Sequence, residues 1–206
     1  MKSDFQCFKL FVLGCLSFFI SQIVLRLPLL NYLNSNFSFT KFALAFPLFV
    51  NGLILVSAGL FEESFRFFFR KFFLRANNYK DQGLLSFTDK IKAPIVFGLG
   101  HGLCEVVYVL YLAGFGFGLE NYLLIFVERF LAVVFHICQS ILIFKGFRLG
   151  KEYLYLFIGI FLHTAFNGLI YLGSALGLMG LYGLFLIFDL VYVLLLKNLT
   201  YERKVI

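Results

Sequence analysis

Residues 175–196 read ALGLMGLYGLFLIFDLVYVLLL, an apolar run whose one charged side chain is Asp189. A transmembrane helix needs about 20 predominantly apolar residues to cross ~30 Å of hydrocarbon. Five further apolar runs of similar length precede it, at about 8–25, 42–62, 93–114, 122–145 and 153–172. The sequence therefore predicts an all-α, polytopic transmembrane helix bundle of about six spans.

The composition of the whole chain agrees with this fold class. Of the 206 residues, 61% are hydrophobic and 14% are charged, whereas a soluble domain has about 45–50% apolar and ~25% charged residues. These values exclude an ordinary soluble globule, a disordered tail and a nucleic-acid-binding module. We expect residues 1–206 to form a single integral membrane domain, a multi-pass protein of the cell membrane in contact with the lipid bilayer.

The basic residues predict how the bundle is oriented. The net charge of +7 comes from 18 Lys and Arg residues against 11 Asp and Glu residues. With the N-terminus in the cytoplasm, fifteen basic residues fall on the cytoplasmic side, Arg26 and Lys41 fall on the opposite side, and Arg129 falls within a span. Cytoplasmic loops carry an excess of Lys and Arg, so both termini should be cytoplasmic. The basic and aromatic loop at about 70–92 should lie at the inner headgroup layer, as a simple anchor or as an interfacial helix.

Polar residues within the predicted spans are the candidate functional residues. An ionisable side chain at membrane depth costs at least about 2.5–3.5 kcal/mol on insertion scales and is a functional candidate by default. All three histidines of the chain lie within predicted spans. Grouped by span, the candidates are Glu62, Glu63 and Arg66; His101 and Glu105; Glu128, Arg129 and His136; and His163 and Asn167.

Depth and spacing bring several of these residues together. At about 1.5 Å per residue, four of them lie roughly 12–16 Å from the cytoplasmic ends of their helices: Glu62, His101, His136 and His163. Residues four apart share a helix face, which pairs His101 with Glu105, His163 with Asn167, and Glu62 with Arg66. Arg129, His136, Gln139 and Ser140 form a polar stripe that must face the bundle. The glycines around His101, at 98, 100 and 102, allow close helix approach.

Each of these residues also has a structural interpretation. A single intramembrane histidine can be a hydrogen-bonded packing residue, and Glu62 with Arg66, or Glu128 with Arg129, can form a structural ion pair. Asp189 is expected to have a packing or helix-orienting role. The joint pattern of three imidazoles, several carboxylates and an amide at one depth nevertheless favours water activation, metal binding or a proton path.

The polar motifs together resemble those of a known family. They are FEESFR at 61–66, GLGHGLCE at 98–105, Glu128-Arg129 with His136, and HTAFN at 163–167. From about residue 55 to 175, the predicted catalytic core, the chain resembles the YhfC family of intramembrane metalloproteases. That family is similar to the CPBP group, which includes the type II CAAX prenyl endopeptidases. Gly-x-Gly-His-Gly-x-x-Glu is the most specific of the motifs.

The resemblance implies roles for individual positions. Glu62 and Glu63 match the acidic pair of the first motif, His101 or His136 matches the histidine of the second, and His163 with Asn167 matches the third. The wider group's first motif is Glu-Glu-x-x-x-Arg, whereas Arg66 comes one residue earlier in this chain. The i,i+4 partner of Arg66 is therefore expected to be Glu62, and either glutamate is a candidate base.

These observations predict an intramembrane peptidase that hydrolyses a peptide bond of a peptide or membrane-protein substrate near the cytoplasmic face. In a metal-assisted version, Glu62 or Glu63 is the general base and Zn²⁺ is held in an open site by His101, His136 and His163, with Glu105 as a further ligand. In a metal-free version, a glutamate and His101 activate water while His163 and Asn167 stabilise the oxyanion. Arg66 keeps the carboxylate pair ionised in both versions.

Two other classes of function fit the same residues. Intramembrane Glu and His also serve proton relays, so a proton-coupled transporter is an alternative, although the sequence lacks the internal repeat that carrier folds often contain. A non-catalytic relative that binds a lipid or a partner helix is another. Proteolysis would distinguish the peptidase from both.

Overall fold

The computed structural model describes residues 2–74, 89–114 and 119–201. Every element in these ranges is helical: α1 (Lys2–Phe18), the π-helix η1 (Phe19–Arg26), α2 (Leu27–Ser35), α3 (Phe37–Ala45), α4 (Pro47–Phe72), α5 (Asp89–Ala113), α6 (Leu119–Leu149) and α7 (Glu152–Tyr201). Within these ranges six stretches are long and apolar enough to cross a membrane: Asp4–Ser35, Pro47–Phe72, Ile91–Leu112, Ile125–Leu149, Glu152–Gly173 and Ala175–Lys197. The predicted all-α fold with six spans is confirmed.

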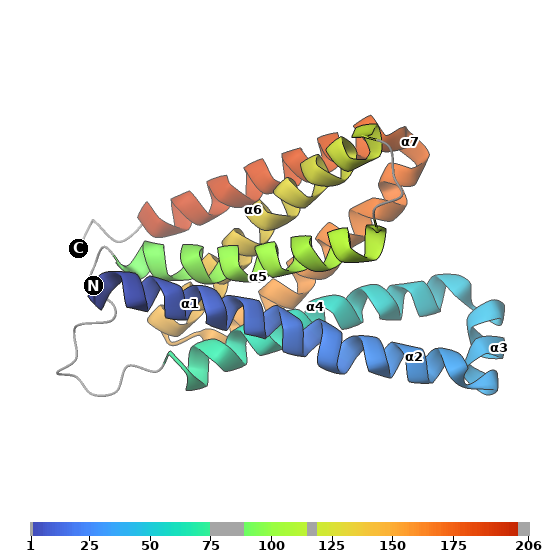
Figure 1. Cartoon of the computed structure of the whole chain (residues 1–206), viewed down its shortest axis with the longest axis horizontal. Coiled ribbons are helices and arrows are strands. Elements are labelled where there is room, and N and C mark those ends of the chain that lie inside the picture. The colour runs from blue at the N-terminus through green and yellow to red at the C-terminus, as the bar shows by residue number, and fades with distance from the viewer. Residues whose placement is uncertain (1, 75–88, 115–118, 202–206) are drawn as a thin grey trace.

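The first span is longer than the predicted 8–25, because α1, η1 and α2 run on as one continuous rod (Figure 1). Proline in a helix removes a hydrogen bond and crowds the carbonyl four residues before it. The wide turns of η1 lie directly before Pro28 and end with the Leu27 N–H bonded to the Gln22 carbonyl. Arg26, which the charge pattern placed outside the membrane, lies within this span.

The second predicted run, 42–62, is divided by the structure into two helices. The chain leaves helical geometry at Phe46, with φ −132° and ψ 60°, because a residue before proline is disfavoured in the α conformation. Pro47 then starts α4, which continues through Phe72. The first residues of the predicted 70–92 loop are therefore helical. The centre of that loop, 75–88, lies outside the described residues.

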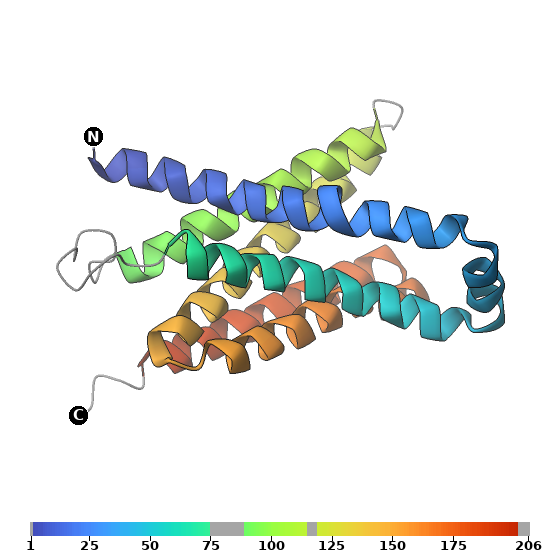
Figure 2. The ribbon, with the colours of Figure 1, turned by 90° about the horizontal axis from the view of Figure 1, so that it is seen from below.

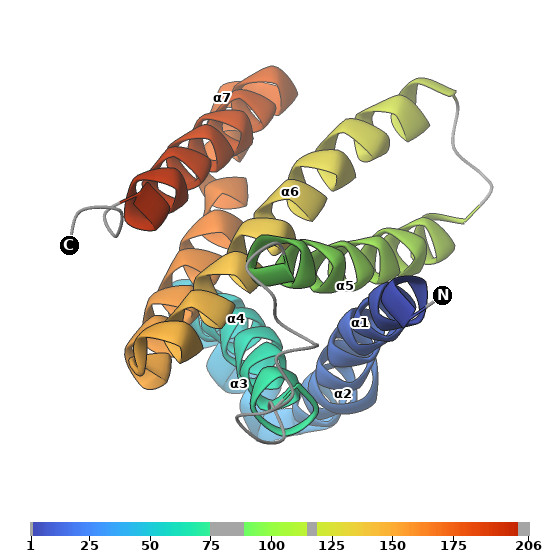
Figure 3. The same cartoon turned by 90° about the vertical axis from the view of Figure 1, so that its left-hand side faces the viewer.

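Of the candidate spans in the described residues, the one in α6 is the most buried. α1 packs against α5, α5 against α6, and α6 and α4 against α7, as Figure 3 shows along the helix axes. The start of α1 and the end of α7 lie at the same end of the molecule (Figure 1). α7 breaks at Gly177, where φ is 71°, so its two halves form the fifth and sixth spans.

Glycines bring α5 into backbone contact with two neighbours. A Cβ on Gly100 would lie 2.1 Å from the Phe11 carbonyl oxygen of α1, and a Cβ on Gly14 would lie 2.1 Å from the Phe97 carbonyl oxygen. On its other side, α5 meets α6 at Gly98, where a Cβ would lie 2.7 Å from Ile137 Cα. The predicted close approach around His101 is confirmed, and Figure 2 shows α5 crossing between its neighbours.

Aromatic packing joins α6 to both halves of α7. Phe135 stacks on Phe166 with ring centroids 4.1 Å apart, and Phe166 stacks on Phe185 at 4.6 Å. Many apolar side chains instead face outward, such as Leu48 at 85% and Met179 at 84% exposure. Such exposure would be costly in water but is expected of side chains that face lipid.

Candidate metal centre and active site

His101 is a fully buried side chain of α5 that is held between α1 and α4. Its Nε2 lies 3.0 Å from Glu62 Oε2, and its Nδ1 lies 2.8 Å from Ser17 Oγ. The Ser17 hydroxyl donates its proton to the Gly14 carbonyl oxygen at 2.7 Å, so Ser17 Oγ accepts from His101 Nδ1–H. In the neutral ring this leaves a lone pair on Nε2. Two acceptors, Nε2 and a carboxylate oxygen, then face each other, an arrangement that requires a shared proton or a cation.

His136 on α6 is oriented in a similar way by different partners. Its Nε2 lies 2.5 Å from Glu105 Oε2, and its Nδ1 accepts a hydrogen bond from Arg66 Nη2 at 3.1 Å. Since the guanidinium is only a donor, the ring proton sits on Nε2 and Glu105 accepts it. His136 Nδ1 also lies 4.0 Å from Glu62 Oε2. This is the same carboxylate oxygen that His101 faces.

Glu62, His101 and His136 therefore offer three buried ligand atoms, which lie within 4.8 Å of one another. Two imidazoles and one carboxylate are a ligand set used by catalytic zinc sites. Metal-binding histidines usually donate their other ring N–H to a carboxylate, a carbonyl or a similar acceptor, as His136 does to Glu105 and His101 does to Ser17. The residues present fit a divalent transition metal, although Arg66 would have to release His136 Nδ1 to it.

Glu63 points to a different imidazole from Glu62. Its Oε1 lies 2.8 Å from His163 Nδ1, and its Oε2 accepts from Arg66 Nε at 3.0 Å. The prediction that Arg66 pairs with Glu62 is thus wrong. Residues three apart also meet on a helix surface, which allows Arg66 to reach Glu63. Glu62 contacts Gln22 and His101 instead.

Arg66 joins α4 to α6 at the centre of the bundle. It is fully buried, and besides Glu63 and His136 Nδ1 it donates to Ser140 Oγ at 2.6 Å and to the His136 carbonyl oxygen at 3.3 Å. His136, Gln139 and Ser140 are all buried, which confirms that this polar stripe faces the bundle.

A cavity of about 50 Å³ opens beside two of the three ligand residues, Glu62 and His136. A buried water needs at least roughly 10–15 Å³ of such volume, so the cavity has room for a few water molecules. Its polar lining includes Glu62, Glu105, His136, His163 and Asn167. His163 Nε2 lies 3.7 Å from Glu62 Oε2, beyond hydrogen-bond distance, and is free to bond to water. Residues of all four motifs line this cavity, whereas Glu63, Arg66 and His101 lie outside its lining.

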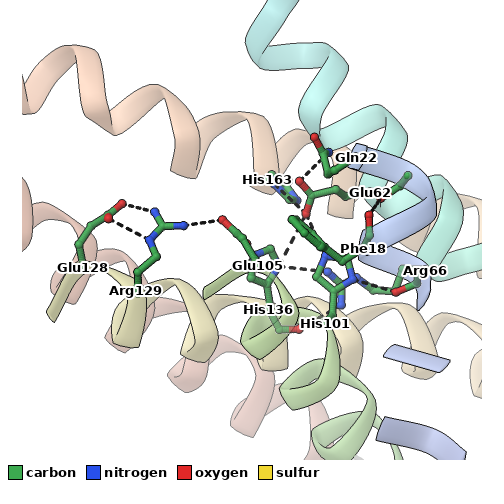
Figure 4. Close-up of polar contacts among 12 residues, drawn as sticks. Phe18, Gln22, Glu62, Arg66, His101, Glu105, Glu128, Arg129, His136 and His163 are labelled. Atoms are coloured by element: carbon green, nitrogen blue, oxygen red, sulfur yellow. Dashed lines mark hydrogen bonds and ion pairs between the residues drawn. The ribbon is translucent and has the colours of Figure 1, made fainter. Parts of the chain in front are cut away.

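Glu128 and Arg129 form the far wall of the same cavity. Arg129 Nη1 donates to Glu105 Oε1 at 2.6 Å, and its Nε donates to Glu128 Oε2 at 2.9 Å. A chain of contacts thus runs from Glu128 through Arg129 and Glu105 to His136, as Figure 4 shows. The expected Glu128–Arg129 ion pair is present, and it also supports the candidate ligand His136.

Comparison with known proteins shows which family the chain belongs to. Residues 2–117 match the family model described as YhfC intramembrane metalloprotease. The chain belongs to the YhfC family. No curated protein and no solved structure matches it. The YhfC match covers Glu62, Glu63, Arg66, His101 and Glu105, which confirms the family, and it ends before the two motifs that contain His136 and His163.

The YhfC match also covers the first span, whose contribution the sequence analysis missed. Ser17 contacts His101, and Gln22 Nε2 donates to Glu62 Oε1 at 2.8 Å. Arg26 Nη1 donates to Gln22 Oε1 at 2.8 Å. The available signal was the four-residue spacing of Gln22 and Arg26, and of Ser17 and Ser21, in an otherwise apolar run.

Proposed function

We propose that this chain is an intramembrane metalloprotease, a hydrolase that cleaves peptide bonds of peptide or membrane-protein substrates within the bilayer. The proposal rests on one observation: Glu62, His101 and His136 place three ligand atoms within 4.8 Å of one another inside an apolar bundle, and two of these residues, Glu62 and His136, also line a polar cavity. Membership of the YhfC family supports the same conclusion. The cytoplasmic side of the bilayer is favoured for the site because the basic residues gather at the helix ends on that side.

The metal ligands in this proposal are Glu62, His101 and His136, with zinc as the metal. Zinc held there would polarise the scissile carbonyl and make a bound water easier to deprotonate. Glu105 would hold His136 through Nε2–H, and the amide of Gln22 would hold Glu62. His163 is left out of the proposed ligand set, because the ligand atoms that lie within 4.8 Å of one another are those of Glu62, His101 and His136, and His163 Nδ1 contacts Glu63.

His163 is proposed as the general base and later the acid. Glu63 accepts the proton of Nδ1 and so leaves the Nε2 lone pair facing the cavity, where it can take a proton from water. A carboxylate in this position fixes the tautomer and stabilises the imidazolium that forms. Protonated His163 can then give the proton to the leaving amine. Arg66 holds Glu63 in place, and Asn167 at the cavity wall can donate to the oxyanion.

The test compares wild-type chain with Glu62→Gln and His101→Ala in cells, and it does not require that the substrate be identified first. Mass spectrometry of membrane fractions would count new protein N-termini that depend on each chain. We expect such termini with wild type and with Glu152→Gln, a matched Glu-to-Gln change at the edge of α7, and none with the two site variants.

Wild-type chain that produces no new termini would overturn the peptidase proposal. Purified wild-type chain should contain about one zinc ion by elemental analysis, and chelation should abolish cleavage of a peptide identified in the first experiment. Full activity of zinc-free chain would overturn the metal version and favour the metal-free one, in which a glutamate and a histidine of the site activate water.

A further inference from the structure

The first span reaches the proposed metal centre at two residues that lie five positions apart. Ser17 Oγ contacts His101 Nδ1 at 2.8 Å and Gln22 Nε2 contacts Glu62 Oε1 at 2.8 Å. Both residues are buried, at 0% and 5% exposure. His101 and Glu62 are themselves 3.0 Å apart, so Ser17 and Gln22 must serve one small region.

An ordinary α-helix would not present both side chains to one region. At ~100° per residue, positions five apart differ by about 140° in direction. The π-helix η1 begins two residues after Ser17 and contains Gln22, and its i→i+5 hydrogen bonds bring positions five apart closer to one face. Gln22 follows within η1 and is visible beside Glu62 in Figure 4. The π-helix therefore allows Ser17 and Gln22 to contact the neighbouring side chains His101 and Glu62.

The orientation of the Gln22 amide is fixed from outside the site. Arg26 Nη1 donates to Gln22 Oε1 at 2.8 Å, so the amide NH₂ group must face Glu62. Arg26 is itself held on α4 by the Ser57 hydroxyl and the Ile54 carbonyl oxygen, both at 3.0 Å. With Oε1 of Glu62 occupied by Gln22, Oε2 is the oxygen left to face His101 and His136.

Ser17 selects the ring nitrogen of His101 that can bind metal. Its hydroxyl proton is committed to the Gly14 carbonyl oxygen, so its oxygen accepts from Nδ1–H and the lone pair stays on Nε2. The contact exists because Gly14 and Gly100 let the α1 and α5 backbones meet.

We infer that Ser17 and Gln22 are positioning residues for metal binding, acting through His101 and Glu62 respectively; this inference rests on the proposed function. The first span is thus part of the metal centre and more than a membrane anchor. Loss of a partner that orients a metal ligand typically costs 10–100-fold in metal affinity.

The test is a Co²⁺ titration of the full chain in detergent micelles, followed by the visible absorption of bound Co²⁺. Ser17→Ala removes the hydroxyl group that contacts His101, and Gln22→Met removes the amide that donates to Glu62 and accepts from Arg26. The matched control is Ser21→Ala. Ser21 is a buried serine of the same rod whose hydroxyl donates to the Phe18 carbonyl oxygen of that rod. Far-ultraviolet circular dichroism checks that each variant is folded.

We expect Ser17→Ala and Gln22→Met each to weaken Co²⁺ binding by about 10–100-fold and to alter the spectrum, while Ser21→Ala binds as wild type does. Wild-type affinity and spectrum in both variants would overturn this inference alone. Equal loss in Ser21→Ala would also overturn it, since a general disturbance of the helix would then be the cause. Wild-type chain that binds no Co²⁺ would overturn the proposed metal centre as well. If one variant fails to fold, the other decides.

Discussion

Glu63 Oε1 lies 2.8 Å from Nδ1 of His163, a residue one hundred positions away in the sequence. The preceding residue, Glu62, faces His101 instead. Adjacent helical residues point about 100° apart, so one short segment of α4 serves two imidazoles from two other spans. The two glutamates are therefore expected to respond differently to mutation.

Replacement of His163 by alanine should stop catalysis without loss of metal. General acid–base catalysis contributes about 10²–10⁴-fold, so we expect kcat to fall at least a hundredfold while zinc content stays at the wild-type level. Cleavage rate and elemental analysis of the same sample measure both quantities, and Glu152→Gln is the control. Loss of zinc in this variant would make His163 a ligand, as the motif pattern first predicted.

Zinc should stabilise the folded chain only when its ligands are intact. A ligand at one hundred times its Kd stabilises by about 2.7 kcal/mol, so added zinc should raise the Tm of metal-stripped wild-type chain. His101→Ala and His136→Ala should show no such rise in a thermal melt in micelles. A rise of the same size in either variant would argue against this ligand set.

The number of spans could be predicted from sequence because each apolar run is long enough to cross the hydrocarbon by itself. The limits of the runs were less predictable. Hydropathy does not distinguish residues 37–45 from the span that follows, and only the conformation of Phe46 before Pro47 separates the two helices. Similarly, the widened turns of η1 leave no mark on hydropathy.

The charged part of the site was predictable because buried carboxylates and imidazoles are costly in lipid and rarely occur without a function. Ser17 and Gln22 are neutral, cost less in an apolar helix and did not stand out. The partner of Arg66 was mispredicted, because positions three and four residues away share its face and only the tertiary contacts of Glu62 decide between them.

Loss of Arg66 should be strongly destabilising. Its removal leaves Glu63, at 0% exposure, as a buried charge without its cation, and breaking a buried pair costs about 3–5 kcal/mol. Arg66→Met should lower the free energy of unfolding by this amount in denaturant titrations in micelles. Lys92→Met, at an exposed position, is the control. The double variant Glu63→Leu/Arg66→Met should recover part of the loss, and a single variant as stable as wild type would contradict the pairing.

The contact between α1 and α5 should not tolerate even one methyl group. Gly14→Ala and Gly100→Ala each place a Cβ within 2.1 Å of a backbone oxygen, and overpacking of this kind costs about 1–3 kcal/mol. Gly52→Ala and Gly168→Ala are matched controls, since nothing lies within 4 Å of a Cβ at either position. Equal stability of all four variants in thermal melts would contradict the close approach.

The predicted orientation can be tested with single cysteines in a chain whose four native cysteines are replaced. Lys151→Cys lies at the turn between α6 and α7, and Asn36→Cys lies between α2 and α3 at the other end of the bundle. In intact cells an impermeant thiol reagent should label Asn36→Cys and spare Lys151→Cys. The reverse labelling would place both termini outside the cytoplasm.

The polar network draws on α1, η1, α4, α5, α6 and the first half of α7, so its members are spread over most of the chain. Glu62 and His101 come before His136 and His163 in the chain, and His163 lies on α7. The set of carboxylates and imidazoles is therefore complete only once the first half of α7 has joined the earlier spans.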